Sequence, residues 1–281
     1  MAVSTQRLRE AVLHWEARVL GCQAPDCSRH HRIWKRISSH SRSIRVHGVQ
    51  YCFPQCFERE LQRKCQALQL SEGFESRRER RIPLGLLMLS RDDVTPAQLH
   101  EALAEQGRRN EMRIGECMQR LGFVGQQQVT AALAAQWRCP VLHKMPRQLL
   151  HCGLPHGLLL EFEMLPVHFV SATRTLHVAF ATEIAYGALV AVEQMLDCRT
   201  EACLVTPAAF QAGIERLQQT AAPSEKLFAN SRSPAEIARI TSSYAARLEA
   251  ENVKLVACGD LAWVRIDGDR EPTNLLFQRP C

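Results

Sequence analysis

Four cysteines in the N-terminal third of the chain have the residue type and spacing that metal binding requires. Cys22 and Cys27 are five positions apart, and Cys52 and Cys56 are four positions apart. Zinc binds thiolates tetrahedrally, and two closely spaced pairs are the usual source of its four ligands. We therefore predict a closed, structural zinc site at these four residues. The alternative is four unrelated buried thiols that serve only in packing.

The second cysteine pair has an informative context. It reads GVQYCFPQCFEREL, in which an aromatic residue precedes the pair and a charged helical segment follows it. This context resembles the treble-clef zinc finger, whose last ligand pair lies at the start of a helix. The resemblance covers roughly Cys22 to Cys65, although the first pair is wider than the commonest spacing. Cys65 is expected on the helix and not at the metal. Four histidines are possible replacements for a thiolate: His30, His31, His40 and His47.

A second set of candidate residues lies in an internal repeat with a period of thirty residues. LGLLMLSRDDVTPAQLHEALAEQ begins at Leu84, and IGECMQRLGFVGQQQVTAALAAQ begins at Ile114. A period in this range indicates one supersecondary unit made twice. Two such copies would form a surface with pseudo-two-fold symmetry, which suits a ligand that has two equivalent halves.

The second copy, read from Arg113 as RIGECMQRLGFVGQQQVTAALAAQ, is similar to the MshEN motif. This motif belongs to the N-terminal domain of bacterial type II secretion and type IV pilus assembly ATPases. The similarity runs from about Ile82 to Leu217 and includes Leu154-Pro155, MLPVHF and LHVAFA. It implies a helical repeat followed by a small α+β subdomain. Many members of the family bind cyclic di-GMP, with one motif for each half of the dinucleotide.

The resemblance implies nucleotide-binding residues in both copies. An arginine fork can hold a phosphate or a guanine edge, and glycine N–H groups can approach a phosphate. A glutamine amide can read a base, and aliphatic side chains can cover the ring faces. The implied residues are Leu84, Gly85, Leu87 and Gln106 in the first copy, and Arg113, Ile114, Gly115, Met118 and Gln136 in the second.

The first copy departs from the motif at two places. Pro83 stands where the motif has arginine, so Arg80 or Arg81 would have to substitute from another position. Asp92 stands where the motif has its later glycine, and Asp93 follows it. Two carboxylates near a phosphate would oppose binding. We therefore expect the second copy to dominate any binding of the ligand.

The elements that position these residues follow from hydrophobic periodicity and capping signals. Each copy is typical of a helix, a turn and a second helix. In the first copy, Thr95 and Gln98 can form a capping box at the start of the second helix. In the second copy, Gly125 and Gln128 occupy the matching positions. The buried positions are expected at Leu99, Ala102 and Leu103, and at Val129, Ala132 and Leu133.

Beyond Pro140 the pattern changes to short helices and strands, which is typical of a small α+β sandwich. Helices are expected at roughly 147–159, 187–196 and 207–217, and strands at 164–170, 175–181 and 201–205. A capping box at Ser233 and Glu236 then starts a further helix, and three short strands follow it. The sequence assigns no function to this αβββ unit.

The predicted fold class is α+β, with seven segments along the chain. They are an N-terminal helix (1–21), a treble-clef-like zinc finger (22–70), a linker (71–81), an MshEN-like helical repeat subdomain (82–140), an MshEN-like α+β subdomain (141–220), a second linker (221–232) and the αβββ tail (233–281).

Composition and absent motifs narrow the function classes. The 281 residues carry a net charge of +6, with thirteen Lys and Arg against five Asp and Glu between Ser28 and Arg81. No apolar run is long enough for a membrane span and no signal-peptide core is present, so we expect a cytoplasmic protein with reduced thiols. No GxxxxGK[ST] phosphate loop and no catalytic arrangement stands out, so we expect no ATPase or other enzymatic activity.

Three interpretations remain. The first is a non-enzymatic signalling or adaptor protein, in which cyclic di-GMP biases contacts between domains or with a protein partner. The second is a zinc-dependent nucleic-acid-binding protein, which would use the basic stretch from Arg29 to Arg45 with Trp34 and Tyr51. The third is a protein–protein interaction scaffold, in which the degenerate repeat only maintains helix packing.

Overall fold

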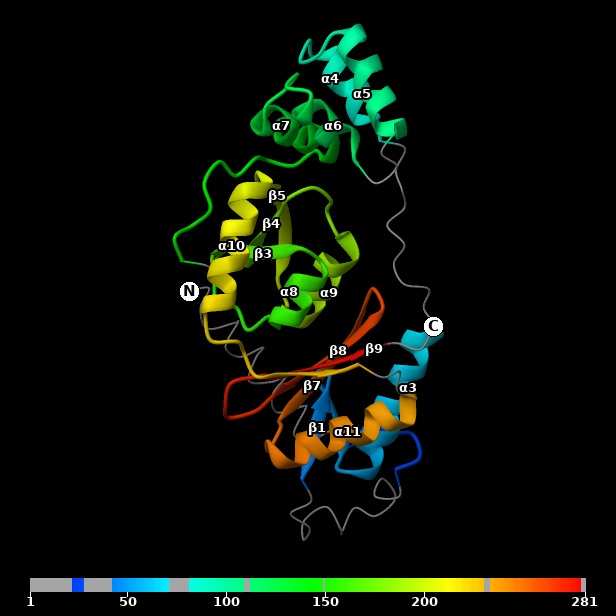
Figure 1. Cartoon of the computed structure of the whole chain (residues 1–281). Helices are drawn as coiled ribbons and strands as arrows, with labels where there is room; N and C mark the ends of the chain where they lie inside the picture. Colours follow the sequence, from blue (N-terminus) through cyan, green and yellow to red (C-terminus); the bar gives the residue numbers. More distant parts are fainter. Residues whose placement is uncertain are drawn as a thin grey trace, which may run out of the picture. The chain divides into compact units, whose positions relative to one another are not determined.

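The computed structural model describes residues 22–27, 42–70, 81–108, 112–148, 150–229 and 233–278. The chain forms two compact units (Figure 1). Unit 1 combines Met1–Phe74 with Pro223–Cys281, and unit 2 is Glu75–Ala222. The expected N-terminal helix (1–21) lies outside the described residues. Within the described ranges, no helix has both the length and the hydropathy of a membrane span.

Unit 1 contains a six-stranded sheet in the order β2-β1-β7-β8-β9-β6. The pairs β1–β7 and β6–β9 are parallel, and the other pairs are antiparallel. The strands are β1 (Ser43–Val46), β2 (Val49–Cys52), β6 (Glu225–Phe228), β7 (Asn252–Cys258), β8 (Leu261–Asp267) and β9 (Thr273–Gln278). The helices α3 (Gln55–Leu70) and α11 (Pro234–Arg247) share one buried apolar core with this sheet.

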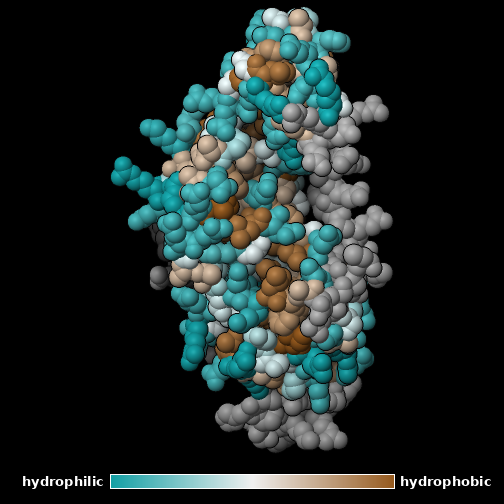
Figure 2. All heavy atoms as spheres, viewed as in Figure 1, coloured by the Kyte–Doolittle hydropathy of each residue, from teal (hydrophilic) through white to brown (hydrophobic). Residues whose placement is uncertain are grey.

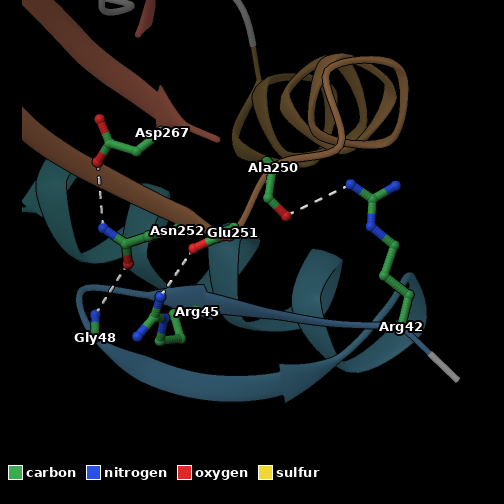
Figure 3. Close-up of polar contacts among 7 residues, drawn as sticks. All are labelled: Arg42, Arg45, Gly48, Ala250, Glu251, Asn252 and Asp267. Carbon is green, nitrogen blue, oxygen red and sulfur yellow. Dashed lines mark hydrogen bonds and ion pairs between the residues drawn. The ribbon is translucent and has the colours of Figure 1, made fainter. Parts of the chain in front are cut away.

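Polar contacts fasten the N-terminal hairpin of unit 1 to its C-terminal part (Figure 3). The Arg42 guanidinium donates hydrogen bonds to the carbonyls of Ala246 at 3.0 Å and Ala245 at 3.1 Å, in the last turn of α11. It therefore satisfies carbonyls that a helix leaves unpaired at its C-terminus, where a positive charge is also favourable. Arg45 forms an ion pair with Glu251 at 3.3 Å. The same view shows three further linked residues, Gly48, Asn252 and Asp267.

Unit 1 differs from the sequence analysis in how its segments combine. Sequence patterns separate the finger (22–70) from the tail (233–281), yet strands of both segments form one sheet. Residues 225–228, expected in a linker, form the edge strand β6. Local patterns predict where strands occur but not which strands pair. Partners such as Arg45 and Asn252 are too far apart in the sequence for any local signal to connect them.

The N-terminal part of unit 2 consists of four helices, which confirms the helix–turn–helix prediction for each repeat copy. They are α4 (Leu84–Ser90), α5 (Pro96–Arg108), α6 (Ile114–Arg120) and α7 (Gln126–Trp137). The capping box at Thr95 is confirmed, and Gly125 shares the half of it that a glutamine side chain supplies. The Thr95 and Gly125 amides donate to the side-chain carbonyls of Gln98 and Gln128 at 2.9 and 2.8 Å. The prediction that Leu103 is buried was wrong, because its side chain is 51% exposed.

The second part of unit 2 is a three-stranded sheet, β3-β4-β5, with three helices. The strands β3 (Met164–Val170) and β4 (Thr175–Phe180) are antiparallel, and β5 (Arg199–Leu204) is parallel to β4. The helices are α8 (His156–Glu161), α9 (Tyr186–Leu196) and α10 (Pro207–Gln219). The helix expected at 147–159 begins only at His156, because Gly153 takes a positive φ and Pro155 precedes the first helical residue.

Candidate functional site

The two repeat copies place their motif glycines in equivalent packing positions. A Cβ atom on Gly85 would lie 2.7 Å from Cδ1 of Leu99, and one on Gly115 would lie 2.9 Å from Cγ1 of Val129. A side chain at either position would force the facing Leu99 or Val129 side chain to shift, so both glycines allow close packing of the first helix of each copy on the second. Leu84 from the first copy also approaches Gly115, at 3.3 Å from such a Cβ. Helix packing thus accounts for both glycines without a ligand.

The terminal glutamines of the repeat make reciprocal contacts between the two copies. The Gln106 side-chain amide donates to the Met112 carbonyl at 3.0 Å, and the Gln136 amide donates to the Ile82 carbonyl at 2.6 Å. Both acceptors lie three residues before the motif glycine of the other copy. These two equivalent hydrogen bonds relate the two copies of the repeat by a pseudo-two-fold axis.

We expect Gln136→Ala and Gln106→Ala each to lower the unfolding free energy of unit 2 by about 1 kcal/mol, because each variant removes one hydrogen bond between the copies. Urea denaturation followed by circular dichroism measures the change. Gln127→Ala is the matched control, since Gln127 is exposed on α7. If Gln127→Ala costs as much as the other two, the reciprocal contacts contribute nothing to stability.

The residues implied for nucleotide binding differ in exposure. Met118 is fully buried in the helical core, and both motif glycines are buried, so none of these three side-chain positions faces solvent. Five others are half-buried: Leu84, Leu87, Gln106, Ile114 and Gln136. Arg113 is different, because 61% of its side chain is exposed.

Arg113 begins the second motif at the N-terminus of α6. Its backbone amide donates to the Glu116 carboxylate at 3.2 Å, which fixes the start of the helix. Its guanidinium lies 3.9 Å from the Glu183 carboxylate, and both side chains are largely exposed. A surface ion pair of this kind is weak and can be exchanged for another anion.

The two departures in the first copy have structural explanations. Asp92 has φ +58°, and Gly122, thirty residues later, has φ +73°. Asp92 thus adopts the left-handed conformation of the motif glycine, which aspartate tolerates better than most residues. The Asp93 carboxylate lies 3.4 Å from Nε of Arg91, which partly neutralises it.

Arg81 does not take the position of the missing motif arginine. The central carbon of its guanidinium lies 3.2 Å from the centroid of the Trp137 ring, at the end of the second copy. Arg80, the other possible substitute, lies outside the described residues. The segment that enters the first copy is therefore held by Trp137 and by the neighbouring Gln136.

The first copy also carries exposed apolar side chains, which the sequence analysis does not identify as candidates. Figure 2 shows apolar side chains within the hydrophilic surface at the end of unit 2 formed by α4 and α5. The exposed apolar residues there are Ile82, Leu86 and Leu103. The sequence could have indicated that Leu86 is exposed. The equivalent position in the second copy is Glu116, and a charged residue there indicates a position that faces solvent.

The four predicted zinc ligands come together in unit 1. The Sγ atoms of Cys22, Cys27 and Cys56 all lie within 4.8 Å of one another. The Cys52 Sγ lies 4.0 Å from the Cys27 Sγ, and the Cys52 amide donates to the Cys22 Sγ at 3.3 Å. Cys52 ends β2, and Cys56 lies in the first turn of α3. Cys65 lies farther along α3 in the apolar core.

Thiols are the donor type that structural zinc binds, and tetrahedral zinc bound to sulfur at about 2.3 Å places the sulfur atoms about 3.8 Å apart. Cys22, Cys27 and Cys56 form a group of three with Sγ atoms within 4.8 Å of one another, and Cys52 lies beside this group, near Cys27. Burial raises the pKa of the Cys52 and Cys56 thiols to about 12, and the nearby Cys22 and Cys27 thiols raise it in the same direction. Of the proposed histidine replacements, His47 accepts a hydrogen bond from the Leu255 amide at 3.0 Å, and the other three lie outside the described residues.

Comparisons with known proteins point to one group of solved structures. No family model and none of the curated proteins matches the chain. The solved structure of MshE with cdg (cyclic di-GMP) is 26% identical, with a TM-score of 0.41, over 48% of this chain and 99% of that one. One structure of the N-terminal domain of XpsE is 17% identical, with a TM-score of 0.34, over 48% and 92% of the two chains. Another crystal form of that domain is 20% identical, with a TM-score of 0.28, over 46% and 90%.

Proposed function

We propose that this chain is a non-enzymatic signalling or adaptor protein, in which unit 2 binds cyclic di-GMP at the tandem repeat. The observation that carries the proposal is the pair of reciprocal hydrogen bonds that Gln106 and Gln136 make between the copies. It arranges two equivalent motifs about a pseudo-two-fold axis. Cyclic di-GMP has the same internal symmetry, with two phosphates and two guanines.

The second copy supplies the stronger half of the proposed site. Arg113 presents an exposed guanidinium, which can form two parallel hydrogen bonds to a phosphate or to a guanine edge. Leu84 from the first copy lies beside Gly115 and gives apolar cover next to this arginine. The first copy supplies no equivalent cation at Pro83, and its Arg81 stacks on Trp137. The ligand would therefore be held mainly by the second motif.

Zinc is the structural cofactor in this proposal. Cys22, Cys27, Cys52 and Cys56 would hold it in a treble-clef-like finger at the base of the hairpin β1–β2 and the start of α3. A site with four protein ligands leaves no open position for substrate, so the metal would serve stability and not catalysis.

The described contacts do not favour the nucleic-acid interpretation. Within the basic stretch from Arg29 to Arg45, only Arg42 and the residues after it are described. Arg42 donates to α11 carbonyls, and Arg45 pairs with Glu251. Both arginines are thus engaged within unit 1, and the proposal assigns the signalling role to unit 2.

A comparison of nucleotides tests the proposal. We expect one cyclic di-GMP to bind per chain, and GMP to bind more weakly, because a monomeric nucleotide can engage only one motif at a time. Titration calorimetry of the full chain measures both. Equal affinity for the two nucleotides, or no binding of either, would contradict a site that uses both copies.

A further inference from the structure

A row of three metal-binding residue types crosses the small sheet of unit 2, on strands that follow the repeat in the chain. His168 on β3 pairs in register with His177 on β4, and His177 pairs with Glu201 on β5. Residues in register on neighbouring strands project from the same face of a sheet. The three side chains therefore form a continuous row, with His168 and Glu201 exposed and His177 partly exposed.

The geometry of this row suits a shared metal ion. The imidazole rings of His168 and His177 have centroids 6.0 Å apart and an interplanar angle of 27°. A tetrahedral zinc ion bound to two imidazole nitrogens at 2.0–2.1 Å would place the ring centroids about 5 Å apart. Because the two rings are stacked, both side chains must also rotate to direct a nitrogen at the same ion, which an open sheet face permits.

Glu201 adds a second feature of natural histidine metal sites. Its carboxylate Oε2 lies 3.6 Å from Nδ1 of His177. Metal-binding histidines almost always direct one ring nitrogen to a carboxylate or carbonyl, which leaves the other nitrogen as the ligand. In this arrangement Nδ1–H of His177 faces Glu201, and Nε2 is left for the metal.

We propose that His168 and His177 bind a divalent transition-metal ion of the zinc type, with Glu201 orienting His177. Imidazole is the commonest protein ligand for such ions. Two protein ligands on an exposed face leave positions for water, so this ion exchanges readily. The site belongs to unit 2 and is independent of the thiolate cluster in unit 1 and of nucleotide binding.

Zinc titration of the full chain tests the proposal. The protein is first loaded with one equivalent of zinc, which occupies any high-affinity thiolate site, and is then titrated with zinc chloride in a calorimeter. We expect one further binding event per chain. His168→Gln and His177→Gln should each weaken it at least about tenfold, because each removes one ligand, and Glu201→Gln should weaken it by about tenfold.

His143→Gln is the matched control, because His143 is an exposed histidine of unit 2 outside the row. It should leave the event unchanged, and thermal melting should show that all four variants remain folded. The proposal is overturned if the wild-type chain shows no further event. It is equally overturned if the event persists unchanged in His168→Gln and His177→Gln.

Discussion

Removing the proposed zinc ion from the cysteine cluster is expected to unfold the C-terminal strands of unit 1 together with the finger. The metal would hold the loop at Cys22 and Cys27 against β2 and the start of α3. Those elements are integral to the unit. The hairpin strand β1 pairs with β7, and α3 contributes Phe57 and Leu61 to the apolar core that it shares with α11. Zinc binding to four thiolates contributes about 10 kcal/mol or more, which is comparable with the whole stability of a domain.

Hydrogen exchange by mass spectrometry measures this effect segment by segment. Treatment with a chelator, or the variant Cys56→Ser, should remove the protection of residues 252–278 while residues 84–137 remain protected. Cys198→Ser is the matched control, since it makes the same chemical change in unit 2. If residues 252–278 keep full protection in the metal-free protein, the cluster does not stabilise this unit.

Local signals in the sequence account for much of unit 2. The capping boxes at Thr95 and Gly125 give the starts of α5 and α7, because a cap depends only on residues within one turn. The thirty-residue period predicts that Gly85 and Gly115 occupy equivalent positions. In the structure, Gly85 packs against Leu99 and Gly115 packs against Val129. Each reciprocal glutamine contact joins a helix to the segment that precedes the first helix of the other copy, and hydrophobic periodicity does not predict such a contact.

Long-range pairing limits what the sequence can show. Arg42 is one of many arginines in a basic stretch, and only the fold places it at the C-terminus of α11. Leu103 fits the apolar spacing of α5, but it is 51% exposed and does not belong to the helical core that contains Leu99 and Ala102. The four cysteines were predictable as a group because two short spacings suffice to identify the pairs.

Replacing Arg113 by alanine is expected to lower the affinity for cyclic di-GMP by about 100-fold. A forked pair of charge-assisted hydrogen bonds contributes about 3 kcal/mol, which corresponds to roughly two factors of ten in the dissociation constant. Arg113→Lys keeps the positive charge but cannot form two parallel hydrogen bonds, so its affinity should lie between those of the wild type and Arg113→Ala. Because Arg113 is exposed, neither change should affect folding, and isothermal titration calorimetry measures the affinities.

The most direct test of the central claim is calorimetric titration of the full chain with cyclic di-GMP, beside Arg113→Ala and Arg239→Ala. Arg239 is an exposed arginine on α11 of unit 1, so its replacement makes the same change in net charge outside the repeat. We predict micromolar or tighter binding that is weakened about 100-fold in Arg113→Ala and retained in Arg239→Ala. Absence of binding to the wild-type chain at high ligand concentration would contradict the account and leave the repeat as a packing scaffold.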